Sequence, residues 1–110
     1  MEVRFYSDSR GEEPVSEYLR KIHRTGDRSA VATAERYIDL LETHGPNLGM
    51  PIDRLLNSAA GLYELRAGNH RIAYGEVDGV IYLVNAWRKQ SRKAPTRELE
   101  RARKRLDELR

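Results

Sequence analysis

Residues 61–95, GLYELRAGNHRIAYGEVDGVIYLVNAWRKQSRKAP, contain three runs of strand-forming residues separated by two pairs of turn residues. Gly68-Asn69 and Asp78-Gly79 readily adopt the positive φ angles of type I′ or II′ turns. Because a two-residue loop fixes which residues lie opposite each other, each turn also predicts a strand register. We therefore expect three antiparallel strands, followed by a cluster of cationic side chains.

The first turn predicts a sheet with one apolar face and one ionic face. Cross-strand neighbours on the apolar face are Tyr63 with Tyr74, Leu65 with Ile72 and Ala67 with His70. On the ionic face Arg66 lies opposite Arg71, and Glu64 lies opposite Ala73.

The second turn extends both faces along the third strand. It adds Ile81 and Leu83 to the apolar face, and to the ionic face it adds Tyr82, Val84, Ala86 and Arg88. Asn85 and Trp87 then fall on the core side. Either they are buried with partners, or a β-bulge shifts the last residues of the strand.

The Arg66–Arg71 pair is the unusual feature of the ionic face, because like charges directly opposite each other destabilise a sheet. Glu64 offsets part of this repulsion, and a bound polyanion such as an RNA phosphate offsets more. The small residues Ala73, Gly75 and Ala86 leave room above the sheet for such a ligand. The alternative is an ordinary solvated face with two ion-paired arginines.

Length and composition indicate one domain, residues 1–110, with a modest core. The absence of cysteine excludes disulfides and thiolate zinc sites and fits a reducing cytosol. No apolar run approaches membrane-spanning length, and the start MEVRFYSDS is not a signal peptide, so we expect a cytoplasmic protein.

Charge is distributed unevenly along the chain. Residues 1–86 hold ten Lys and Arg against thirteen Asp and Glu, whereas residues 87–110 hold ten against four. This asymmetry points to a polyanionic partner, most often nucleic acid, although basic helices also dock acidic proteins.

The rest of the chain predicts elements that cover the sheet. A first strand is expected around residues 2–6, two amphipathic helices over 12–26 and 27–45 that bury the apolar face, and a connector over 46–61 that packs Met50, Ile52, Leu55 and Leu56 against the sheet edge. After Pro95, a final basic helix has a thin apolar stripe that suits one-sided docking or a partner: Leu99, Ala102, Leu106 and Leu109.

The chain offers no metal or nucleophile motif. Its three histidines are scattered, with His23 and His44 in the last turns of helices and His70 beside the hairpin turn on the apolar side. What remains is a basic cluster around Glu64, and such a cluster suits metal-independent RNA cleavage. Arginines would stabilise the phosphorane oxyanion, while Glu64 or a lysine with a lowered pKa, Lys89 or Lys93, would take the 2′-OH proton. The alternative is a solvated loop that only neutralises phosphates.

The order GLYELR, HRIAY, a strand ending in an aromatic residue, and K-x-S-x-K-x-P before a basic helix resembles the phage-related HigB branch of the RelE/ParE toxin superfamily. The resemblance covers about half of the chain closely, from the Gly49-Met50-Pro51 connector to about Arg105. It implies a small RelE-like α+β fold, with a helix hairpin on one face of an antiparallel-rich sheet and the active site on the other.

The resemblance also implies a function and its residues. The family's members are toxins of bacterial type II toxin–antitoxin pairs that cleave mRNA, usually on the ribosome, and are neutralised by a small antitoxin, often a helix-turn-helix protein. Arg71 matches the arginine of the family's strand motif, Lys89 and Lys93 its two basic loop positions, and Ser91 its threonine. Trp87 stands where phenylalanine is usual.

Two departures from the family affect proton transfer. Leu62 and Glu64 stand where RelE has lysines on the strand, and no tyrosine follows Tyr82 to match the C-terminal catalytic tyrosine of RelE. The mechanism must therefore use Glu64, a lysine or a ribosomal group.

The sequence thus predicts an endoribonuclease toxin without metal or cofactor. The predicted catalytic residues are Arg71, Lys89, Lys93, Glu64 and Arg66, and the predicted RNA-binding residues are Arg88, Ser91, Arg92, Arg97 and Trp87. The alternative function is a non-catalytic ParE-like gyrase poison or a phage-derived binding protein on the same fold.

Overall fold

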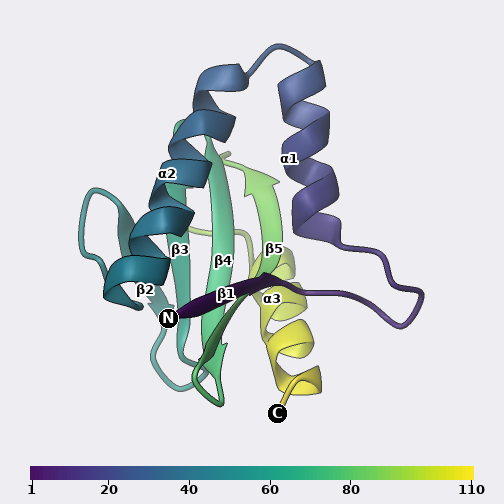
Figure 1. Cartoon of the computed structure of the whole chain (residues 1–110), viewed down its shortest axis with the longest axis vertical. Coiled ribbons are helices and arrows are strands. Elements are labelled where there is room, and N and C mark those ends of the chain that lie inside the picture. Colours follow the sequence, from purple (N-terminus) through teal and green to yellow (C-terminus); the bar gives the residue numbers. More distant parts are fainter.

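The computed structural model describes all 110 residues and contains three helices and five strands (Figure 1). In chain order the elements are β1 (Glu2–Phe5), α1 (Pro14–Arg24), α2 (Arg28–His44), β2 (Asp53–Asn57), β3 (Leu62–Ala67), β4 (His70–Val77), β5 (Val80–Arg88) and α3 (Thr96–Glu108). The strands form one sheet in the order β1-β5-β4-β3-β2, in which only the β1–β5 pair is parallel. The predicted α+β architecture is confirmed. None of the three helices is long and apolar enough to cross a membrane.

The hairpin from β3 to β4 has the predicted register. Tyr63 lies opposite Tyr74, Leu65 opposite Ile72 and Arg66 opposite Arg71. The rings of Tyr63 and Tyr74 stack with their centroids 5.3 Å apart, on the face that α2 covers. The Gly68-Asn69 turn therefore sets a register that puts apolar side chains on one face of the hairpin and the arginines on the other, as the sequence indicated.

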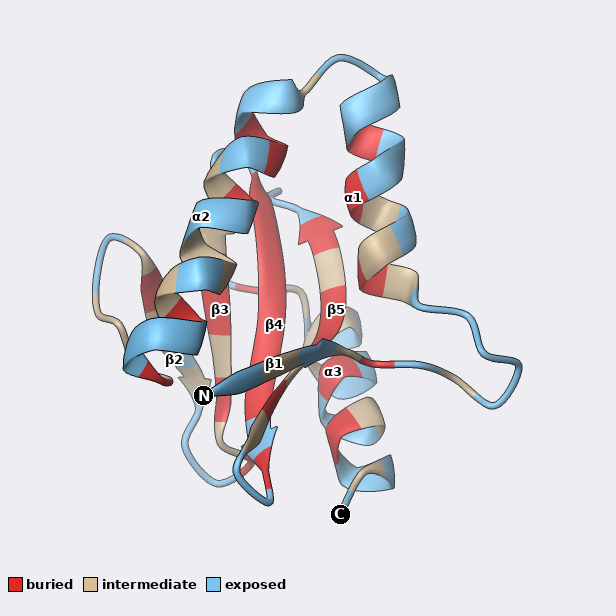
Figure 2. Ribbon diagram, viewed as in Figure 1, coloured by how far each residue is buried: buried red, intermediate tan, exposed pale blue.

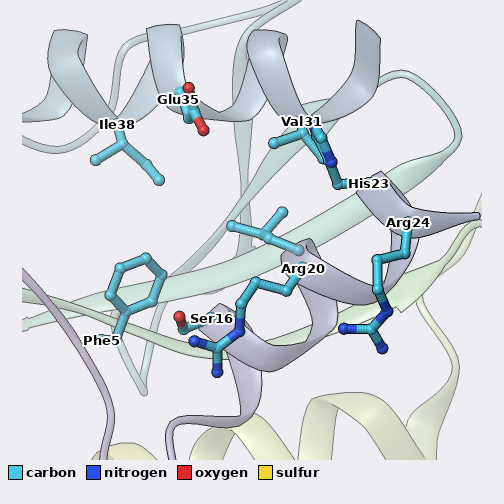
Figure 3. Close-up of a pocket in the computed structure, with 9 residues that line it drawn as sticks. Phe5, Ser16, Arg20, His23, Arg24, Val31, Glu35 and Ile38 are labelled. Atoms are coloured by element: carbon cyan, nitrogen blue, oxygen red, sulfur yellow. The ribbon is translucent and has the colours of Figure 1, made fainter. Parts of the chain in front are cut away.

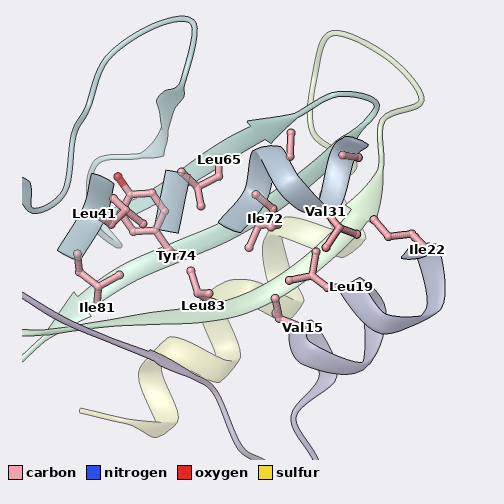
Figure 4. Packing of buried hydrophobic residues seen from close by; sticks show 13 residues of the cluster. Val15, Leu19, Ile22, Val31, Leu41, Leu65, Ile72, Tyr74, Ile81 and Leu83 are labelled. Carbon is pink, nitrogen blue, oxygen red and sulfur yellow. The ribbon is translucent and has the colours of Figure 1, made fainter. Parts of the chain in front are cut away.

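The main core lies between this apolar face and the α1–α2 hairpin (Figure 4). Figure 2 shows β4 buried along almost its whole length, with the helices exposed on their outer sides. The residues that fill this layer are large aliphatic side chains and one tyrosine: Val15, Leu19, Ile22, Val31, Leu41, Leu65, Ile72, Tyr74, Ile81 and Leu83.

The connector contains a strand that the sequence analysis did not predict. β2 pairs antiparallel with β3, with Arg54 opposite Glu64 and an irregularity between Leu55 and Asn57. Ile52 packs against the main core, but Met50 and Leu55 are exposed, so the expectation that both pack against the sheet edge is wrong. The edge is extended by backbone hydrogen bonds rather than covered by side chains.

The last helix, α3, packs on the opposite face of the sheet and forms a second core cluster with it. Ala102 and Leu106 are fully buried there. A Cβ atom added at Gly75 would lie 2.5 Å from Cδ2 of Leu106, so Gly75 permits close approach of the helix. The prediction that Ala73 and Gly75 leave room for a ligand is therefore wrong, because α3 fills that space.

A β-bulge in β5 changes the faces of its last residues. Tyr74 pairs with Leu83 but Ala73 pairs with Asn85, so Val84 is the extra residue. Asn85 and Trp87 consequently lie on the α3 face, whereas Ala86 packs against the main core. The sequence left two options for Asn85, burial with a partner or a shift by a bulge, and both hold. The bulge shifts Asn85, and its buried side-chain amide donates to the backbone carbonyl oxygen of Glu98 at 3.0 Å.

Candidate functional site

The candidate site is centred on Glu64, whose side chain is only 1% exposed. Its Oε2 accepts hydrogen bonds from Nε of Arg54 at 2.6 Å and from Nη1 of Arg66 at 3.1 Å. Nε of Arg71 lies 3.9 Å from the same oxygen. The single negative charge of Glu64 thus offsets only one of the three guanidinium charges. Two positive charges remain in excess at this end of the sheet.

Arg71 is fixed by the turn that precedes its strand. Its Nη1 donates to the carbonyl oxygens of Gly68, at 2.9 Å, and of His70, at 3.0 Å. The side chain is 6% exposed, and this burial, followed by the charge of Arg66, lowers the pKa of Arg71. An arginine remains a cation under such conditions, so a positive charge is held in a poorly solvated position.

Arg54 belongs to the site, and the sequence analysis missed it. It reaches Glu64 because β2 pairs with β3, and its Nη2 donates to the carbonyl oxygen of Arg92 at 2.7 Å. Arg54 therefore ties the sheet to the loop that follows β5. The sequence does contain a signal for β2. The apolar pair Leu55-Leu56 is followed by a few residues that end in Gly61, and this spacing is typical of a longer hairpin loop.

The basic loop, residues 89–95, lies beside this cluster. Lys89 donates its backbone N–H to the carbonyl oxygen of Asn69 at 2.7 Å, so the loop starts next to the β3–β4 turn. The hydroxyl of Ser91 donates to the carbonyl oxygen of Lys93 at 2.8 Å. The side chains of Lys89, Arg92 and Lys93 are exposed and are free to meet a polyanion.

Three predicted RNA-binding residues are placed differently from this group. Arg88 lies opposite His70, so its predicted place on the Arg66–Arg71 face is wrong, and the bulge at Val84 is the cause. Trp87 is 4% exposed and packs in the second core cluster, which leaves little of its ring for a base. Arg97 is exposed in the first turn of α3.

His70 is a buried structural residue, as its place on the apolar side indicated. Its Nε2 lies 2.8 Å from Oδ2 of Asp27, and its Nδ1 lies 2.7 Å from the hydroxyl of Tyr18. The hydrogen bond from His70 is the main cause that lowers the pKa of Asp27. No three His, Cys, Asp or Glu side chains gather where they could hold a metal ion.

A separate groove lies between α1 and α2, on the face of the sheet away from Glu64 (Figure 3). Its volume is about 480 Å³. Apolar side chains line its floor, namely Phe5, Leu19, Val31 and Ile38, and polar and charged side chains line its rim, namely Ser16, Arg20, His23, Arg24 and Glu35. The groove therefore suits an apolar segment that carries negative charge rather than a phosphodiester.

Comparison with known proteins gives a family and a fold. Residues 22–107 match the family model described as "Phage derived protein Gp49-like (DUF891)". No curated protein matched the sequence. Among solved structures, the chain resembles one from the YoeB–YefM toxin–antitoxin heterotetramer of Staphylococcus aureus, with a TM-score of 0.52 and 20% identity over 76% of this chain and 90% of that chain.

These matches confirm the resemblance noted from the motifs and the arrangement of helices around the sheet. The family model covers most of the chain, from the end of α1 to α3, and the structural match concerns the fold. The chain belongs to the phage-derived Gp49-like family and has a RelE/YoeB-like toxin fold.

Proposed function

We propose that this chain is the toxin of a bacterial type II toxin–antitoxin pair and acts as a metal-independent endoribonuclease on mRNA at the ribosome. The observation that carries the proposal is the buried Glu64 carboxylate with three arginines around it and two positive charges in excess. Such a cluster attracts an anion that approaches from solvent, because the excess charge lies in a poorly solvated place. The resemblance of the sequence motifs to toxins that cleave mRNA makes an RNA phosphate the anion that we expect here.

The cleavage that this site would perform begins at a ribose 2′-OH. The 2′-oxygen attacks the adjacent phosphorus, the bond from phosphorus to the 5′-oxygen breaks, and the products are a 2′,3′-cyclic phosphate and a 5′-hydroxyl. Arg66 and Arg71 would stabilise the negative charge that develops on the phosphorane oxygens. Arg71 suits this role because two backbone carbonyls already hold its guanidinium in place.

Proton transfer would use Glu64 and the basic loop. All three arginine contacts of Glu64 use Oε2, which leaves Oε1 to accept the 2′-OH proton. Lys89 or Lys93, both exposed on the loop, would protonate the departing 5′-oxygen. Ser91 and Arg92 in the basic loop and Arg97 in the first turn of α3 would bind neighbouring phosphates.

The same proposal includes a small antitoxin, expected to be a helix-turn-helix protein, that neutralises the chain. The α1–α2 groove supports such a partner, because its apolar floor has a rim of Arg20, His23 and Arg24 against the single acidic residue Glu35. An amphipathic segment with acidic residues would complement it. The solved relative was crystallised as a toxin–antitoxin complex, which agrees with this expectation.

The test is to induce the wild-type chain and Arg71→Ala in a bacterial host and to map new RNA 5′ ends within minutes. We expect new ends within reading frames for wild type, a loss of about 100-fold or more for Arg71→Ala, and no loss for the exposed control Arg36→Ala. Co-expression with the product of the neighbouring reading frame should abolish the ends. Growth arrest without new ends would refute the nuclease and favour a protein target such as gyrase.

A further inference from the structure

A second cleft lies beside the Glu64 cluster, between β2, the basic loop and the start of α3. Its volume is about 390 Å³, which is within the usual range of about 300–1,000 Å³ for sites that bind small molecules. It is lined by Arg54, Leu55, Leu56, Arg92, Lys93, Ala94 and Leu99. Three of these residues are cationic and none is acidic, so the cleft is complementary to an anion that also has an apolar part.

Arg54 joins this cleft to the candidate site. Its Nε contacts Glu64 at 2.6 Å, and its Nη2 contacts the carbonyl oxygen of Arg92, a residue of the cleft, at 2.7 Å. The guanidinium of Arg54 therefore lies between the Glu64 cluster and the cleft and contacts residues of both. A ligand with a phosphate at the arginines around Glu64 would extend directly into the cleft.

The apolar part of the cleft is incompletely covered. Leu56 and Leu99 both pack against the second core cluster, yet both remain partly accessible. Ala94, which also lines the cleft, has a small side chain. A flat apolar group can therefore lie on the two leucines while its charged end stays among Arg54, Arg92 and Lys93.

We propose that this cleft is a nucleotide subsite that holds the base next to the phosphate bound at the Glu64 cluster. The base packs on Leu56 and Leu99, and its own phosphate lies between Arg92 and Lys93. This inference rests on the proposed function and adds to it a place where the flanking base is recognised. Because the apolar contact grows with the size of the ring system, the subsite prefers a purine to a pyrimidine.

The test separates contacts to the base from contacts to the backbone. The probes are fluorescent ten-nucleotide 2′-O-methyl RNAs, which cannot be cleaved because the 2′-OH is blocked: oligoadenylate, oligouridylate and an abasic ribose-phosphate chain. We expect wild type to bind oligoadenylate more tightly than oligouridylate, and both more tightly than the abasic chain. Leu99→Ser and Leu56→Ser should weaken oligoadenylate binding about fivefold and leave abasic binding unchanged.

The matched control is Leu109→Ser. Leu109 lies in the same C-terminal region and packs against the same cluster as Leu99, but it does not line the cleft. This variant should bind all three probes as wild type does. Melting temperatures of the three variants verify that each is folded during the binding measurement.

The possible results distinguish the subsite from the nuclease proposal. If Leu99→Ser and Leu56→Ser weaken all probes equally, or none, while wild type still produces new RNA 5′ ends, the subsite is refuted and the nuclease stands. If wild type neither binds these probes nor cleaves RNA in cells, both proposals fail. A purine preference in wild type that Leu99→Ser removes would establish the subsite.

Discussion

Two buried carboxylates lie on neighbouring strands of the sheet, Asp53 in β2 and Glu64 in β3. Asp53 accepts the backbone N–H groups of Leu48 and Gly49, at 3.1 and 2.8 Å, and the hydroxyl of Tyr74. Glu64 has only arginines as partners. Both carboxylates are buried, but neutral donors surround the first, whereas arginines with a net excess of positive charge surround the second.

The difference distinguishes a structural carboxylate from one in the proposed binding site. Every partner of Asp53 is part of the backbone or a buried phenol, and burial is the main cause that raises the pKa of Tyr74 far above its ordinary range. Nothing in that arrangement can be exchanged for a ligand. Around Glu64, by contrast, the surplus charge of Arg54, Arg66 and Arg71 leaves donors that an incoming phosphate can use.

The largest effect should come from Asp53→Ala, which leaves two backbone amides and the Tyr74 hydroxyl without their shared acceptor. Each unpaired buried donor costs about 1–3 kcal/mol, so we expect a loss of about 4 kcal/mol in the free energy of unfolding. Urea unfolding followed by circular dichroism measures it. RNA cleavage per folded molecule should not change.

The control for this variant is Tyr74→Phe, which removes one donor to Asp53 and the acceptor of the Asn47 N–H, and keeps the ring stacked on Tyr63. We expect a loss of about 2 kcal/mol. Equal losses for the two variants would mean that the backbone amides contribute little and that the contrast with Glu64 is overstated.

A smaller effect on stability, but a clear effect on function, is expected from Glu64→Gln. This variant keeps the size of the side chain and removes its charge, so the arginines repel one another and attract anions more strongly. Non-cleavable RNA should bind about fivefold more tightly at low salt. RNA cleavage should fall about 100-fold, because the proposed proton acceptor is lost.

Sulfate provides an independent measurement on the same variant. Added sulfate should raise the melting temperature of Glu64→Gln more than that of wild type, since the anion replaces the missing carboxylate. Asp53→Asn should gain nothing from sulfate. If both variants respond alike, the excess charge is not specific to the Glu64 cluster.

The smallest effect concerns Asp27, a half-exposed carboxylate whose pKa is lowered mainly by the hydrogen bond from His70. A depressed pKa in the folded state means that the ionised form stabilises the fold. This contribution is present above the ordinary pKa of aspartate and is lost as the pH falls through the lower pKa of the folded state.

The measurement compares wild type with Asp27→Asn from about pH 6 to about pH 3. The stability difference between the two proteins should shrink as the solution becomes more acidic. A constant difference over this range would show that the contact of Asp27 with His70 does not depend on the charge of Asp27.

Much of the sheet was predictable, because local turn chemistry determines it. Gly68-Asn69 fixed the register that places Arg66 opposite Arg71 and near Glu64. β2 was missed because it lies in a proline-containing connector, and Arg54 was missed with it. The contribution of Arg54 to the site depends on the β2–β3 hairpin, whose loop carries only Gly61 as a turn signal and lacks the two-residue turn that marks the β3–β4 hairpin.

The place of α3 could not be read from its sequence. Its apolar stripe predicts a buried side but does not say which face of the sheet it covers. Gly75 was interpreted as open space, whereas it allows close approach of Leu106. The bulge at Val84 was considered but could not be located, so Arg88 was assigned to the wrong face.

The pairing of β1 with β5 has a consequence for how the protein is made. β1 is the first strand to be synthesised, yet its partners are Val80 to Leu83, near the end of the sheet in sequence. The basic loop and α3 follow only after these residues. A nascent chain therefore cannot complete its sheet until β5 has left the ribosome, so β1 stays without its strand partner while the α1–α2 hairpin and β2 to β4 are made.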